Sequence, residues 1–152
     1  MPTSNAWKKQ FDNVWPTNSP HLLCVLLGGK CGVYNSNDNT FPVTLVYDGI
    51  GDTNFPYLWI VKQGGKYGVY NSDKVQIMLL PVFYNVDMGA GDIFKVSFTR
   101  RTSFKFNVKK RLWEDPQAVI MYCTKNKKDM LPWAHLYTTK PEQALRYVQG
   151  SA

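Results

Sequence analysis

The chain has 152 residues, of which 44% are hydrophobic and 14% aromatic, and it carries a formal net charge of +7. This length matches one folded domain, and the composition is too apolar for a disordered chain. No apolar run approaches the roughly 20 residues of a membrane-spanning helix, and residues 1–20 lack the charged-then-apolar layout of a signal peptide. We therefore expect a single domain over residues 1–152 that is cytoplasmic and not bound to a membrane.

Residues 4–16 predict an amphipathic helix, with a serine available as its N-cap and a proline that stops it. Its apolar stripe consists of Trp7, Phe11, Val14 and Trp15. We expect this helix to cover one open end of a sheet. The two tryptophans then serve as core or lid residues, or alternatively as anchors for a partner.

A repeat dominates the centre of the chain. Residues 28–36 (GGKCGVYNS) return almost unchanged as residues 64–72 (GGKYGVYNS), a shift of 64 − 28 = 36 residues. The match extends upstream, where residues 20–25 lie over residues 56–61 in the same apolar register. Self-similarity at this period indicates supersecondary units that bury their apolar faces by stacking on one another.

Each unit predicts a three-stranded antiparallel meander. A strand of bulky residues runs into a Gly-Gly turn, and a returning strand ends in Asn-Ser turn chemistry. A third strand follows, at residues 41–47 in the first unit and 76–84 in the second, and its proline favours a sheet edge or a bulge. Gly32 and Gly68, inside the returning strands, indicate a bulge or the close approach of another backbone segment.

These units resemble the WG-containing repeat of bacteria, which carries a Gly-Lys-Trp-Gly core, an aliphatic-aromatic-Asp/Asn continuation, and a later proline and aromatic residue. The matching residues are 29–35 with Pro42 and Tyr47, and 65–71 with Pro81 and Tyr84. Cys31 and Tyr67 stand where the family has its tryptophan. Over roughly residues 20–90, the resemblance implies a β-rich, non-catalytic repeat module that interacts with proteins.

A degenerate third unit follows the second. Adding 36 to residues 58–60 gives residues 94–96, and apolar alternation over residues 93–111 predicts a hairpin whose turn holds arginines instead of glycines. A terminal unit must meet water on its outer face, so degeneracy is typical of a capping repeat. Residues 139–150 then predict a closing amphipathic helix with capping-box spacing at its start.

The predicted fold is therefore mainly β, with tandem three-stranded antiparallel meander repeats of period 36 and short N- and C-terminal helices. The first repeat covers about residues 20–55 and the second about residues 56–92. The degenerate third unit and its cap occupy about residues 93–152.

Positive charge is concentrated in the C-terminal part. Residues 1–92 hold 6 Lys and Arg against 7 Asp and Glu, a balance of −1, whereas residues 93–152 hold 12 against 4, a balance of +8. The predicted partner-binding residues are Arg100, Arg101, Lys105, Lys109, Lys110 and Arg111. Such a surface fits an acidic protein partner, a nucleic acid, or a solvated edge that resists aggregation.

The sequence gives little support for a catalytic site or a metal-binding site. The chain has two histidines, His21 and His135, and three cysteines, Cys24, Cys31 and Cys123, at wide and irregular spacing. That spacing favours neither a disulfide framework nor a zinc site, and reduced buried thiols are the expected state. We expect no enzymatic activity, no cofactor and no bound metal.

The leading hypothesis is a non-enzymatic protein-binding module, a small bacterial or phage inhibitor, immunity or adaptor protein that acts through its basic surface. The alternative is a nucleic-acid-binding accessory protein. A steep fall of binding with added salt would distinguish the alternative.

Overall fold

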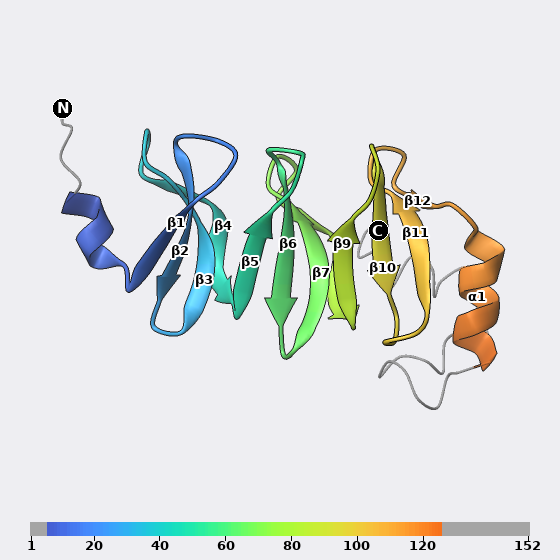
Figure 1. Ribbon diagram of the computed structural model, residues 1–152. Helices are drawn as coiled ribbons and strands as arrows, with labels where there is room; N and C mark the ends of the chain where they lie inside the picture. Colours follow the sequence, from blue (N-terminus) through green and yellow to red (C-terminus); the bar gives the residue numbers. More distant parts are fainter. Residues whose placement is uncertain (1–5, 126–152) are drawn as a thin grey trace.

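The computed structural model describes residues 6–125 and shows three twisted, antiparallel, four-stranded sheets in a row (Figure 1). The first sheet contains β1 (Asn13–Pro16), β2 (Leu22–Leu27), β3 (Lys30–Asn35) and β4 (Thr40–Tyr47). The second contains β5 (Gly49–Asp52), β6 (Leu58–Gln63), β7 (Lys66–Asn71) and β8 (Gln76–Phe83). The third contains β9 (Asn85–Met88), β10 (Ile93–Ser97), β11 (Ser103–Asn107) and β12 (Leu112–Trp113). The mainly β, meander-repeat fold predicted from the sequence is confirmed.

Each predicted unit gains a strand at its beginning, and the predicted third hairpin also gains β12 at its end. The strands gained at the beginning, β1, β5 and β9, start at residues 13, 49 and 85, so they keep the 36-residue period although their sequences differ. Within each sheet the strands are paired in chain order. One residue, at position 48 or 84, separates the last strand of one sheet from the first strand of the next. The repeat therefore begins earlier in the chain than the sequence match does.

The predicted N-terminal helix is much shorter than expected. A 3-10 helix, η1 (Ala6–Gln10), is present, but residues 13–16 form β1, so the helical prediction for Val14 and Trp15 is wrong. These two residues pair with Val25 and Cys24 on β2. Pairing with β2 satisfies the backbone of a segment whose β-branched and aromatic residues favour a strand, and this tertiary contact outweighs the helical spacing.

Two glycines fix the distance between neighbouring strands, as the sequence predicts. A Cβ on Gly32 would lie 2.6 Å from the Val43 carbonyl oxygen, and one on Gly68 would lie 2.6 Å from the Pro81 nitrogen. The pairing of β3 with β4 and of β7 with β8 shifts register near these positions. The edge strands β4 and β8 carry the prolines, which is where proline is tolerated.

The turns after β3, β7 and β11 are built in the same way. The side-chain oxygens of Asn35, Asn71 and Asn107 accept hydrogen bonds from backbone N–H groups two or three residues later, at 2.8–3.1 Å. These asparagines recur every 36 residues, which extends the repeat into the third unit. The turn role predicted for Asn35 and Asn71 is confirmed, and the structure adds the same role for Asn107.

The third unit is a hairpin of β10 and β11, as predicted, but its alignment with the second unit differs by one residue. Val86 pairs with Val96 just as Ile50 pairs with Val61, so Val96 takes the place of Val61 with a shift of 35 residues. The loop before β10 is one residue shorter than the loop before β6. The predicted equivalence of residues 94–96 with 58–60 is therefore wrong by one position.

The apolar core lies between the sheets. Trp59 of the second sheet is 1% exposed and packs with Cys24, Val33 and Val43 of the first sheet. A second, larger cluster joins the second and third sheets and includes Phe83, Phe94 and Phe106. Each sheet thus buries its apolar residues against its neighbour, as stacked repeats do.

Both ends of the row are covered. Phe11, just after η1, packs against Tyr34 with ring centroids 5.3 Å apart. At the other end, α1 (Pro116–Lys125) buries Val119 and packs Tyr122 on the third sheet. This helix was not predicted, although Asp115 caps it by accepting a hydrogen bond from the Ala118 N–H at 3.1 Å.

The predicted C-terminal helix at residues 139–150 lies outside the described residues, as does the side chain of Trp7. Across residues 6–125, no helix has the length and apolar character needed to cross a membrane.

Replacing Gly68 by alanine should lower the free energy of unfolding by about 1–3 kcal/mol, because the added Cβ meets backbone atoms that cannot move aside. The control is Gly51→Ala, where a Cβ has no atom within 4 Å. We expect that change to alter stability by less than about 0.5 kcal/mol. Urea denaturation compares the two variants, and equal effects would contradict the close backbone approach.

Val75 should be replaceable by asparagine with a gain in stability. It is 72% exposed and has φ of 50°, a left-handed conformation that is costly for a β-branched residue. Asn39, at the equivalent position of the first unit, has φ of 60°. We expect Val75→Asn to raise the free energy of unfolding by about 1 kcal/mol. The same change at exposed Val46, in strand β4, should give no gain.

Candidate functional site

The third sheet carries the six basic residues predicted to bind a partner, but it does not gather them into one cluster. Five residues of β11 separate the two turns at its ends, a distance of roughly 16 Å at 3.3 Å per residue. The groups are Arg100 and Arg101 in the β10–β11 turn, Lys105 within β11, and Lys109, Lys110 and Arg111 in the β11–β12 turn. All are exposed except Arg111, which is half-buried.

Opposite charges flank the middle of this hairpin. In the strand ladder, Lys105 lies opposite Lys95, and Lys95 lies opposite Asp87 on β9. On the other side, the Glu114 N–H donates a hydrogen bond to the Lys105 carbonyl at 2.9 Å. One acidic residue, two lysines and a second acidic residue therefore follow one another in a row across the sheet. Their charges sum to about zero midway along the hairpin.

A groove of about 600 Å³ lies beside this row. Its lining includes Ile93 and Phe104, the two lysines of the row, and Glu114. A lining that combines apolar side chains with charges of both signs suits a protein side chain better than a phosphate.

The turn that holds Arg100 and Arg101 maintains its own shape. The N–H groups of Phe98 and Thr99 donate hydrogen bonds to the Thr102 carbonyl, at 2.8 and 3.3 Å. The Arg101 N–H donates to the Thr99 hydroxyl oxygen at 3.3 Å. Neither guanidinium is needed to close the turn, and both arginine side chains are exposed.

The corresponding turns of the first two sheets are held differently, by an aspartate just before the first strand of each sheet. The Gly28 N–H donates to the Asp12 carboxylate at 2.9 Å, and the Gly64 N–H donates to the Asp48 carboxylate at 2.8 Å. The third sheet has Tyr84 at the matching position and no glycine pair in the turn. The third sheet therefore lacks both the aspartate and the glycine pair of the first two sheets.

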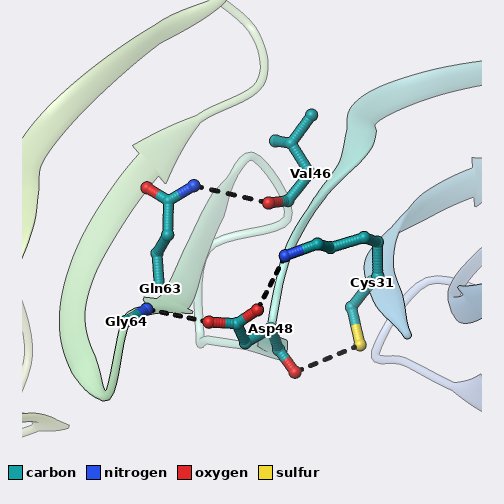
Figure 2. A network of polar contacts seen from close by, with 6 residues as sticks. Cys31, Val46, Asp48, Gln63 and Gly64 are labelled. Carbon is teal, nitrogen blue, oxygen red and sulfur yellow. Dashed lines mark hydrogen bonds and ion pairs between the residues drawn. The ribbon is translucent and has the colours of Figure 1, made fainter. Parts of the chain in front are cut away.

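Asp48 connects the first sheet to the second, as Figure 2 shows. Its carboxylate accepts a hydrogen bond from the Gly64 N–H and forms an ion pair with Lys30 at 3.0 Å. The Gly64 hydrogen bond, and then Lys30, hold the pKa of Asp48 below its ordinary value. The Cys31 thiol donates to the Asp48 carbonyl at 3.7 Å, and the Gln63 amide donates to the Val46 carbonyl at 3.4 Å.

The two described cysteines are free and buried, as predicted. They line a hollow of about 400 Å³ between the first and second sheets, together with Trp15 and Asp52. Burial, and then the charge of Asp52, raises the pKa of Cys24 to about 12, and burial also raises the pKa of Cys31. A thiol with a raised pKa is a poor nucleophile at neutral pH.

The remaining candidates are dispersed. The half-buried His21 lies in the β1–β2 loop, where its carbonyl accepts the Ser36 N–H at 2.9 Å. His135 and the Cys123 side chain lie outside the described residues. Trp15, one of the predicted anchors, is 40% exposed at the rim of the hollow. Within residues 6–125, His, Cys, Asp and Glu form no group suited to holding a metal ion.

Two further exposed residues, which were not among the predicted partner-binding residues, lie at the junction of the second and third sheets. Lys66 and Tyr84 are exposed there, and Tyr84 stands 36 residues after Asp48. A comparison of equivalent repeat positions, and not of total charge, would have found them.

Comparison with known proteins adds no family. No protein-family model matches the chain, and no curated protein does. Among solved structures, the chain is similar to a crystal structure of HIRA(644-1017), with 10% sequence identity and a TM-score of 0.38. The match covers 68% of this chain and 39% of that one.

Asp48→Asn should lower the free energy of unfolding near neutral pH and make it less dependent on pH in the acidic range. The folded-state pKa of Asp48 is lowered, so its carboxylate contributes to the free energy of unfolding. This contribution is complete above the unfolded-state pKa of about 3.9 and is lost as the pH falls through the folded-state pKa. Thermal unfolding measured between neutral and acidic pH checks this. Asp73→Asn, at an exposed aspartate in the β7–β8 turn, is the matched control. Identical pH profiles for the two variants would contradict the role of Asp48.

Proposed function

We propose that the chain is a non-enzymatic protein-binding module that docks an acidic protein surface through the third sheet. The observation that carries the proposal is the exposed Arg100–Arg101 pair in a turn that closes without either side chain. An arginine pair without a structural task is available for forked hydrogen bonds to carboxylates.

The distribution of charge favours a protein over a nucleic acid. A phosphate backbone is bound by a continuous series of cations, whereas Asp87 and Glu114 flank the lysines midway along the hairpin. The groove lined by Ile93 and Phe104 adds apolar area of the kind found in protein interfaces.

We further propose that the repeats are of the WG type. Support comes from Gly32 and Gly68, the second glycines of the two Gly-Lys-x-Gly segments, where a neighbouring backbone excludes any side chain. A motif glycine of this family would then be required by packing. The free buried thiols of Cys24 and Cys31 fit a reducing compartment, so the proposed setting is the cytoplasm of a bacterial cell, for an inhibitor, immunity or adaptor protein of bacterial or phage origin.

Charge reversal at the turn tests the proposal. The partner is first isolated by a pull-down from the native host with mass spectrometry. We expect Arg100→Glu combined with Arg101→Glu to weaken binding of that partner about tenfold or more at low salt, with slower association and an unchanged melting temperature.

The matched control reverses Lys109 and Lys110, which lie at the opposite end of the same strand. It changes net charge equally and should weaken binding much less. Equal losses in the two double variants would mean that net charge alone matters. Undiminished binding by the arginine variant would contradict the proposal. Tight, steeply salt-dependent binding to an oligonucleotide, with no protein partner, would instead support nucleic acid.

A further inference from the structure

The two junctions between sheets have the same backbone plan. Tyr67 pairs with Phe83 as Cys31 pairs with Tyr47, which places Lys66 next to Tyr84 as Lys30 is next to Asp48. On the other side, Asn85 pairs with Ser97 as Gly49 pairs with Lys62. Tyr84 therefore lies between Lys66 and the arginine turn, in the place that Asp48 occupies between Lys30 and the Gly64 turn.

The chemistry of the two junctions differs. At the first, one carboxylate receives both the Lys30 ammonium at 3.0 Å and the Gly64 N–H at 2.8 Å (Figure 2). At the second, Tyr84 supplies a phenol that is 45% exposed, and no ion pair involves Lys66 within residues 6–125. The following turn adds Arg100 and Arg101.

Asp87, the acid nearest to Tyr84 in the sequence, is engaged with other groups. Asp87, two residues into β9, accepts a hydrogen bond from the Asn85 amide at 2.9 Å and lies beside Lys95 in the ladder. The second junction thus combines Lys66, the two arginines and a phenol donor, while the chain provides no carboxylate at the position where the first junction has one.

We propose that the junction of the second and third sheets is a carboxylate-binding site that receives an aspartate or glutamate side chain from an acidic segment of the partner. Lys66 would hold the carboxylate as Lys30 holds Asp48, and the Tyr84 hydroxyl and the arginine turn would replace the backbone N–H donor. The first junction supplies the precedent, because its frame already holds a carboxylate. This inference rests on the proposed function and specifies the site and the chemistry of the partner.

A carboxylate introduced at position 84 should compete with the partner's carboxylate for Lys66 and the arginine turn. Tyr84→Asp recreates the residue found at position 48, so we expect the variant to fold and to bind a hexaglutamate peptide about tenfold more weakly than the wild type. Isothermal titration calorimetry at low salt measures binding, and circular dichroism confirms folding. Hexalysine should not bind to the wild type.

A second pair of variants keeps the test independent of any effect of Tyr84→Asp on folding. Lys66→Gln should weaken hexaglutamate binding by a similar factor, because the exposed ammonium is the expected ligand. Lys30→Gln makes the same change at the first junction, where Asp48 already fills the role, and should leave the affinity unchanged.

Three outcomes would overturn the inference. The first is wild-type affinity in both Tyr84→Asp and Lys66→Gln, the second is an equal loss in Lys66→Gln and Lys30→Gln, and the third is preferential binding of a thymidine hexanucleotide at this junction. If only the double arginine variant loses the native partner, the junction site fails while the proposed function stands. If that variant also keeps the native partner, the proposed function itself fails.

Discussion

Each sheet buries its apolar residues against the next, and this packing determines how the row of sheets is built. A four-stranded sheet with strands of two to eight residues cannot bury its apolar residues alone, and Trp59 is covered only because the first sheet lies against it. The same constraint explains both ends of the row. Phe11 covers the first sheet and Val119 of α1 packs against the third, so that neither terminal sheet exposes a full apolar face.

The two junctions meet this constraint in different ways. The first adds a polar connection at Asp48 to its apolar packing. The second relies on aromatic contacts, with the Phe83 ring centroid 5.0 Å from that of Phe98 and 6.2 Å from that of Trp113. These buried rings hold the second and third sheets together although Tyr84 stands at the position equivalent to Asp48.

Much of the fold could be predicted from the sequence because the hairpins carry local signals. The glycine turns and the asparagines that end β3 and β7 form hydrogen bonds or turns within a few residues, so a short stretch of sequence is enough to predict them. The strands β1, β5 and β9 have no such signal, since they are defined by pairing with β2, β6 and β10. The six basic residues could be picked out by their charge, but their division among two turns and the strand between them depends on where β11 begins and ends. The proposal for Tyr84 required the strand registers, because these show that position 84 in the third sheet is equivalent to position 48 in the second.

The two turns differ in one respect: a carboxylate holds the turn of the second sheet, whereas the turn of the third sheet closes without one. Amide proton chemical shifts measured by NMR between neutral and acidic pH test this difference directly. The Gly64 amide should shift as Asp48 is protonated, with a midpoint below the ordinary aspartate pKa, because its hydrogen bond ends on that carboxylate. The Thr99 amide, which donates to the Thr102 carbonyl, should show no such transition. A Gly64 amide that does not titrate, or a Thr99 amide that titrates in the same way, would contradict the account.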